Sequence, residues 1–277
     1  MDRRVFLTAL AAGTLSALAG CAGEKPPTKA VAKVSESEAL ALRLPPQTAG
    51  HAVPPPPTYK AIPGPPQTLD RLTGGAGRMA LTVDDGTSPE VLAAYVDFVI
   101  ASGIRLTFFV NGVYPSWLQV KAKLVPLVES GQVQLGNHTW DHPSITELSD
   151  SEVARQLQQN ETFLRKHFGV AGAPYFRPPY GNHNERTDRI SGGLGFSRTV
   201  MWWGSLGDSA VLTAEQVLAQ ARKWFLAERL IIGHANHPAV THIYPEMLQL
   251  IRSRNLQTVT LRDVFGDLPL TAALAAS

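Results

Sequence analysis

From residue 78 onward, short apolar runs alternate along the chain with longer amphipathic ones. The short runs are rich in β-branched and aromatic residues, which is typical of buried strands. They predict seven strands, at residues 79–84, 106–111, 133–137, 174–177, 199–203, 229–233 and 257–261. Because helical patterns separate these runs, the chain is expected to form repeated strand–helix units around a parallel sheet.

Several of the intervening helices have recognisable ends. Ser88 followed by Pro89 fits an N-cap with proline at the first helical position, and Gly103 is expected to end that helix. Residues 149–152 and 213–216 both fit the capping box, in which a serine or threonine precedes a glutamate or glutamine by three positions. These signals place the helices between the predicted strands.

Polar side chains capable of chemistry gather where the predicted strands end. Six different strands end at or just before such residues: Asp84 and Asp85, Asn111, His138, Arg177, Asp208 and His234. An open doubly wound sheet would bring together only the residues near its switch point. In a (β/α) barrel all the strand ends meet at one mouth, so the pattern favours a barrel.

Two of these strand ends carry groups that bind metals. Asp84 and Asp85 are adjacent, and His138 and His142 are separated by three residues. One carboxylate and two imidazoles suit a catalytic zinc site with open positions, and the second carboxylate is left as a candidate general base. Taken alone, histidines at this spacing are more often surface or capping residues of a helix.

The N-terminal segment has the layout of an export signal. Arg3 and Arg4 precede an apolar run at residues 5–19 that is too short to span a bilayer comfortably. The Arg-Arg-x-Phe-Leu pattern resembles a twin-arginine signal, and the Leu-Ala-Gly-Cys ending at Cys21 resembles a bacterial lipobox. We therefore expect residues 1–20 to be a signal peptide, and lipidated Cys21 to anchor the protein at the extracytoplasmic face of a bacterial membrane.

Residues 21–76 are rich in proline and poor in large apolar residues, which predicts a flexible linker. Residues 77–277 are then long enough for a single catalytic domain. Cys21 is the only cysteine, so a disulfide within one chain is excluded. The net charge is only +2 and no basic stripe favours nucleic acid as a partner. We expect a monomer.

Five motifs together resemble the polysaccharide deacetylases of carbohydrate esterase family 4, the NodB-homology domain. They are Thr-Val-Asp-Asp-Gly at 82–86, His-Thr-Trp-Asp-His-Pro at 138–143, Arg-Pro-Pro-Tyr-Gly at 177–181, Ser-Leu-Gly-Asp-Ser at 205–209 and Ile-Gly-His at 232–234. The fourth departs from the usual Asp-x-x-Asp-Trp, because Ser205 and Ser209 replace its first and last residues. The resemblance covers roughly residues 78–265 and implies a distorted (β/α)7 barrel.

The resemblance also assigns roles. It implies that Asp85, His138 and His142 bind a divalent metal, zinc in the first place, with cobalt, nickel or manganese as substitutes. Asp84 would be the general base, and Arg177 would keep it ionised and oriented.

Other groups would act on the leaving group and the oxyanion. By resemblance, the backbone N–H of Tyr180 is a donor to the oxyanion. His234 is the candidate acid for the leaving amine, and Asp208 is expected to tune its pKa. His183 and His237 are its rivals.

Three further residues are candidates for binding substrate. Trp202 and Trp203 offer aromatic faces on which a sugar ring can stack, although either could equally belong to the core. Asn111 is a candidate substrate contact or a cap of the next helix.

The resemblance implies metal-dependent hydrolysis of N-acetyl groups from an amino-sugar polymer, either peptidoglycan-like or chitin-like. Three alternatives stay open. They are an O-acetyl esterase acting on a xylan-like glycan, a small-amide hydrolase, and a catalytically silent glycan-binding lipoprotein.

Overall fold

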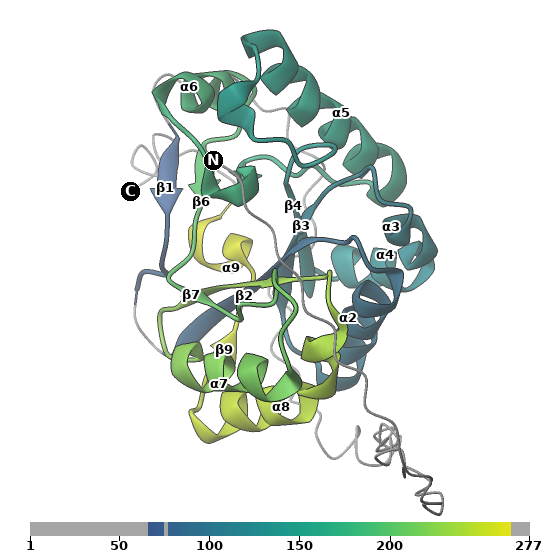
Figure 1. The fold of residues 1–277 in the computed structure, drawn as a ribbon, viewed down its shortest axis with the longest axis vertical. Coiled ribbons are helices and arrows are strands. Elements are labelled where there is room, and N and C mark those ends of the chain that lie inside the picture. Colours follow the sequence, from purple (N-terminus) through teal and green to yellow (C-terminus); the bar gives the residue numbers. More distant parts are fainter. Residues whose placement is uncertain (1–65, 75–76, 267–277) are drawn as a thin grey trace, which may run out of the picture. The chain divides into compact units, whose positions relative to one another are not determined.

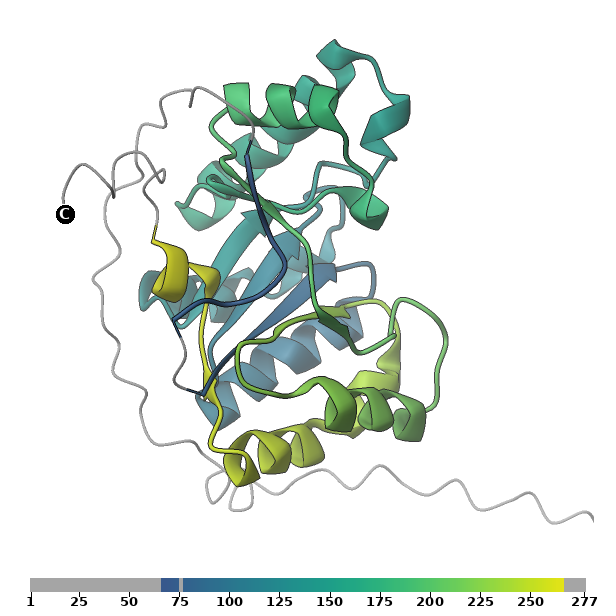
Figure 2. The same ribbon diagram turned by 90° about the vertical axis from the view of Figure 1, so that its left-hand side faces the viewer.

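A computed structural model describes residues 66–74 and 77–266. The predicted signal peptide, the lipidation site Cys21 and most of the predicted linker lie outside these residues. In the described part, nine strands form one sheet. The sheet is curled and flanked by helices, as Figures 1 and 2 show.

All seven predicted strands form, some of them shorter than expected. The strands are β1 (Gln67–Leu69), β2 (Arg78–Asp85), β3 (Leu106–Val110), β4 (Val133–Asn137), β5 (Tyr175–Phe176), β6 (Arg198–Val200), β7 (Gly204–Ser205), β8 (Leu230–His234) and β9 (Gln257–Thr258). Their order in the sheet is β1-β6-β5-β4-β3-β2-β8-β7, and β9 pairs with β2. The last predicted strand ends early because Thr260 caps a helix that begins at Leu261.

The segment that contains β6 and β7 brings the sheet round into a distorted barrel. β6 pairs with β5, whereas β7, which follows after three residues, pairs with β8. The backbone N–H of Trp203, between them, donates to the carbonyl of Leu230 at 2.9 Å. The strands therefore run as a ring from β2 through β3, β4, β5, β6 with β7, and β8 back to β2. This confirms the predicted barrel architecture.

Strand β1 lies inside the segment predicted to be a linker. It pairs in parallel with β6. Leu69 and Leu72 are buried in an apolar cluster with Val200 and Leu230. The folded domain thus includes Gln67–Leu69, earlier than the predicted boundary at residue 77, because these leucines have an apolar surface to cover.

The helices are α2 (Pro89–Ser102), α3 (Ser116–Gln119), α4 (Lys121–Glu129), α5 (Asp150–Phe168), α6 (Glu185–Gly193), α7 (Ala214–Trp224), α8 (Tyr244–Ser253) and α9 (Leu261–Phe265). The predicted helix ends are confirmed. Ser88 accepts a hydrogen bond from the N–H of Val91, and Gly103 ends α2 with a φ of 74°. The capping boxes that begin at Ser149 and Thr213 both form.

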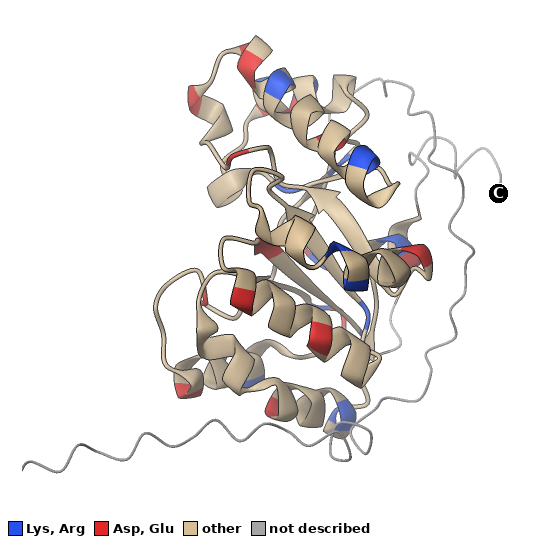
Figure 3. Cartoon of the chain, turned by 90° about the vertical axis from the view of Figure 1, so that its right-hand side faces the viewer, with Lys and Arg blue, Asp and Glu red and all other residues tan. Residues whose placement is uncertain are grey.

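The main apolar core lies between the sheet and its flanking helices. It includes Leu92 and Val96 of α2, Phe108 of β3 and Met247 of α8, all of them completely buried. Acidic and basic residues are interspersed on the helices of the face shown in Figure 3. Every helix within the described ranges is too short or too polar to cross a membrane.

Candidate active site

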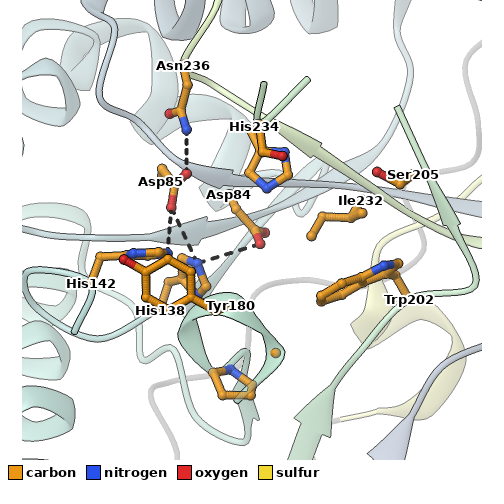
Figure 4. Close-up of a pocket in the computed structure, with 13 residues that line it drawn as sticks. Asp84, Asp85, His138, His142, Tyr180, Trp202, Ser205, Ile232, His234 and Asn236 are labelled. Carbon is orange, nitrogen blue, oxygen red and sulfur yellow. Dashed lines mark hydrogen bonds and ion pairs between the residues drawn. The ribbon is translucent and has the colours of Figure 1, made fainter. Parts of the chain in front are cut away.

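A pocket of about 410 Å³ lies at the carboxyl ends of the central strands, as shown in Figure 4. It brings together residues from all five motifs, which are far apart in the sequence. The residues that line it are Asp84, Asp85, His138, His142, Pro178, Tyr180, Gly181, Trp202, Ser205, Ser209, Ile232, His234 and Asn236.

Asp85, His138 and His142 present three candidate ligand atoms within 4.8 Å of one another. The Nε2 atoms of both histidines lie 3.4 Å from Oδ1 of Asp85. This oxygen is buried and makes no hydrogen bond within the part of the chain that the structure describes. Because a buried polar atom without a partner is unfavourable, a cation held by these three residues fits the site. One carboxylate and two imidazoles suit zinc.

Two of the candidate ligands, Asp85 and His142, are in protonation states that a metal requires. Burial and the nearby imidazole of His138 lower the pKa of His142 to about 4. Burial works to raise the pKa of Asp85, but the neighbouring histidines, His138 first among them, outweigh it and hold that pKa below its usual range. Near neutral pH, Asp85 is therefore a carboxylate and His142 a neutral imidazole.

Buried amides hold the loop that carries the two histidines. The side-chain amide of Asn111 donates to the carbonyls of His138 and Thr139. Gln156 of α5 accepts hydrogen bonds from two successive backbone N–H groups of the loop, at 2.9 and 3.2 Å. These bonds stabilise positive φ angles of 68° at Thr139 and 64° at His142. Asn111 therefore supports the loop, and it is not one of the described residues that line the pocket.

Asp84 has a different partner from its neighbour Asp85. Its Oδ1 lies 2.6 Å from Nη1 of the fully buried Arg177. Arg177 also donates to Oγ1 of Thr82 at 2.8 Å and to two backbone carbonyls at 3.0 Å, so its guanidinium is fixed in orientation. The remaining oxygen of Asp84, Oδ2, lies 3.6 Å from Nε2 of His138. Asp84 therefore has one carboxylate oxygen free to accept a proton beside the metal ligands.

His234, at the end of β8, lies on the other side of Asp84 (Figure 4). Its Nδ1 is 3.0 Å from Oδ1 of the fully buried Asp208, and its backbone N–H donates to Oδ2 of the same carboxylate at 3.2 Å. Burial works to lower the pKa of His234, but the hydrogen bond that its Nδ1–H donates to Asp208 and the charges of Asp84 and Asp208 raise it overall. The imidazole thus stays protonated to a higher pH than an ordinary histidine.

Tyr180 and Trp202 line the pocket, but Trp203 is not among its lining residues in the described chain. The ring of Tyr180 packs edge-on against His142, with the ring centroids 4.6 Å apart. The ring of Trp203 instead contacts the guanidinium groups of Arg71 and Arg229, at 3.8 and 4.0 Å. Trp202 is therefore better placed than Trp203 to contact a substrate in the pocket.

His183 and His237, the other candidates for the catalytic acid, are not among the described residues that line the pocket. Nδ1 of His183 is 3.0 Å from the carboxylate of Asp188, and His237 precedes the 3₁₀ turn Pro238–His242. Their placement leaves His234 as the histidine paired with Asp208.

Sequence reasoning missed Asn236. Its Nδ2 lies 2.6 Å from Oδ2 of Asp85, on the side away from the histidines. Asn236 follows His234 by two residues, in a loop, where no periodicity or motif distinguishes an asparagine that contacts a ligand from one that faces solvent.

Residues 72–198 match the family model described as polysaccharide deacetylase. The chain is 28% identical over 194 residues to the peptidoglycan-N-acetylglucosamine deacetylase PgdA of Listeria monocytogenes. The aligned residues cover 69% of this chain and 39% of that protein. It is 26% identical over 209 residues to a chitin deacetylase of Colletotrichum lindemuthianum, over 70% of this chain and 81% of that one. The chain thus spans about two fifths of the bacterial relative's length.

Solved structures share the fold. The Colletotrichum chitin deacetylase superposes with a TM-score of 0.65 at 22% identity, over 74% of this chain and 94% of that one. A CE4 family pseudoenzyme from Bacillus anthracis superposes with a TM-score of 0.63 at 18% identity, over 72% of this chain and 69% of that one. Over these residues the chain is similar to polysaccharide deacetylases in sequence, and it shares their fold. Because a pseudoenzyme shares the fold, activity has to be argued from the site.

Proposed function

We propose that this protein is a metal-dependent deacetylase that hydrolyses N-acetyl groups of an amino-sugar polymer, with zinc as its metal. One observation carries the proposal, namely that a single pocket contains a metal-ligand set, a carboxylate fixed by arginine and an imidazole paired with a carboxylate. The likeness to peptidoglycan and chitin deacetylases supports a polymer of N-acetylated glucosamine as the substrate.

Zinc bound by Asp85, His138 and His142 would polarise the substrate carbonyl and lower the pKa of a water molecule. Asp84, whose Oδ1 is held by Arg177, accepts a proton from the attacking water at Oδ2.

His234 carries out the second proton transfer, which is to the leaving group. Kept protonated by Asp208, it donates a proton to the leaving nitrogen. The backbone N–H of Tyr180 is the proposed second donor to the oxyanion. These residues provide both proton transfers that amide hydrolysis needs.

Acetate release from a panel of acetylated glycans, with and without EDTA, tests this function. The panel contains peptidoglycan, chitin oligosaccharides and O-acetylated xylan, and the ring opening of a small cyclic amide is followed in a separate assay. We expect release from an N-acetylated polymer, loss of that release in EDTA, and recovery with zinc. Faster release from xylan would assign an esterase, and cleavage of the small amide alone would assign an amide hydrolase. No release from a zinc-bound protein would favour a silent glycan-binding protein.

We further propose that the protein is exported and lipid-anchored through Cys21. The twin arginines and the lipobox-like sequence support this location, and cell-wall glycan is within reach of a membrane-anchored enzyme. Metabolic labelling with a radioactive fatty acid tests it, because the label should enter the wild type and not Cys21→Ser. Equal labelling of both proteins would contradict the anchor.

A further inference from the structure

Asn236 links the metal site to the loop that follows β2, using both ends of its side-chain amide. Its Nδ2 donates to Oδ2 of Asp85 at 2.6 Å. Its Oδ1 accepts from the hydroxyl of Thr87 at 2.7 Å. Asn236 lines the pocket but takes no part in the proton transfers described above.

These two contacts agree on one orientation of the amide. A carboxylate oxygen only accepts hydrogen bonds, so the end of Asn236 that faces Asp85 has to be the NH₂ group. The opposite end then presents an oxygen to Thr87, whose hydroxyl can donate. The flipped amide would bring two acceptor oxygens together at Asp85.

Backbone hydrogen bonds fix the chain on which Asn236 sits. The N–H of Ala235 donates to the carbonyl of Asp84, and the N–H of Ser88 donates to the carbonyl of Ala235, both at 3.0 Å. The loop after β8 is therefore joined to the loop after β2 one residue before Asn236. This leaves the amide little freedom to move away from Asp85.

The two oxygens of Asp85 consequently have different surroundings. Oδ2 is engaged by Asn236. Oδ1 is buried, lies 3.4 Å from Nε2 of both His138 and His142, and has no hydrogen-bond partner among the described residues.

We propose that Asn236 is a positioning residue that leaves a single oxygen of Asp85 free for the metal. With Oδ2 engaged, Asp85 offers one atom beside the two imidazoles, and positions stay open for water and substrate. Without the amide, the carboxylate can rotate and present either oxygen or both. The inference rests on the metal site of the proposed function, but on neither its substrate nor its reaction.

Zinc affinity, measured by competition with a chromophoric chelator, tests this role. Loss of a bond that orients a metal ligand typically weakens metal binding by about 10–100-fold. We expect a loss of this size in Asn236→Ala and a smaller loss in Thr87→Val, which removes the hydroxyl that orients the amide. Asn182→Ala is the matched control, because the exposed amide of Asn182 makes one side-chain hydrogen bond within the described residues, to Ser144 at 3.4 Å, and the variant should bind zinc like the wild type.

Melting temperatures of the metal-free proteins separate positioning from a general loss of stability. We expect metal-free Thr87→Val to have the same melting temperature as the metal-free wild type, although it binds zinc more weakly. Wild-type affinity in both Asn236→Ala and Thr87→Val would overturn the inference and leave the proposed function standing. If Asn236→Ala does not fold, wild-type affinity in Thr87→Val alone overturns it. A wild type that binds no zinc would overturn the metal site itself.

Discussion

Asp84 and Asp85 are adjacent, yet both line the same pocket. Successive side chains of a regular strand point to opposite faces. Asp85 leaves the extended conformation with a φ of 73°, so the alternation is broken at this residue. One carboxylate can then face Arg177 while the other faces the histidines, which separates a proton acceptor from a metal ligand within two residues.

Replacing Asp84 with asparagine should separate catalysis from metal binding. The substitution keeps the size of the side chain but removes the basic oxygen, so acetate release should fall by about 10²–10⁴-fold. Zinc affinity should stay near that of the wild type because Asp84 is not a proposed ligand. Asp97→Asn, on an exposed residue paired with Lys123, is the control for the same chemical change. Loss of zinc together with activity would contradict the role as a base.

The pair of His234 and Asp208 predicts a pH effect. A group that donates a proton is active below its pKa, and the pKa of His234 is raised by Asp208 against the opposing effect of burial. Activity should therefore decline as pH rises through this pKa. Asp208→Asn removes the negative charge, lowers the pKa, and should move the alkaline limb of the kcat profile to lower pH.

The rival acid His183 provides the control for that measurement. It is paired with Asp188 in a similar way, at 3.0 Å. If His234 is the acid, Asp188→Asn should leave the alkaline limb where it is. A shift in Asp188→Asn and none in Asp208→Asn would assign the proton transfer to His183.

At the scale of elements, β1 shows that the domain depends on a segment with linker-like composition. Leu69→Ala should lower the free energy of unfolding by about 2–5 kcal/mol, because a buried leucine is replaced by a cavity beside Val200 and Leu230. Thr68→Ala, on an exposed residue of the same strand, should change it by less than about 0.5 kcal/mol. Denaturant unfolding measures both. Equal midpoints for the two variants would contradict a structural role of β1.

The elements that sequence analysis predicted were those with long or well-marked patterns. Strands such as β4, with a continuous buried run, and helices with complete caps were found at the right places. β1 and β7 were missed although they are no shorter than β5, β6 and β9, because Gln67, Thr68, Gly204 and Ser205 do not belong to a β-branched or aromatic run of the kind that marked the other strands.

Side-chain direction was equally hard to predict at particular residues. Trp202 and Trp203 are adjacent, yet Trp202 lines the pocket while the ring of Trp203 contacts Arg229, and the sequence does not show which of the two faces the pocket. Asn236, in the loop after β8, contributes through side-chain hydrogen bonds with Asp85 at the end of β2 and with Thr87 in the loop that follows it. Such a contact depends on how the loops meet, which only the assembled barrel determines.

At the scale of the whole molecule, the site exists because the barrel brings distant strand ends together. β2 supplies Asp84 and Asp85, the chain after β4 supplies His138 and His142, and β8 supplies His234. The fold positions these groups without ensuring activity, since a pseudoenzyme shares it. The chemistry therefore depends on a few side chains, whereas their geometry depends on the ring of strands.

Metal binding should consequently stabilise the entire domain. A ligand that binds only the folded state adds about 2.7 kcal/mol at 100 times its dissociation constant. For a domain of this size, that should raise the melting temperature by about 5–10 °C, and EDTA should reverse it.

His142→Ala tests whether this stabilisation comes from the proposed site. It removes one ligand, so zinc should no longer raise the melting temperature, and zinc should no longer restore acetate release after EDTA treatment. His242→Ala, at an exposed histidine outside the pocket lining of the described chain, should keep the full shift. A zinc-dependent shift that persists in His142→Ala would place the stabilising metal elsewhere on the protein. Because the ligands come from two separate strand ends, a shift confined to proteins with all three ligands would show that zinc links those ends in solution.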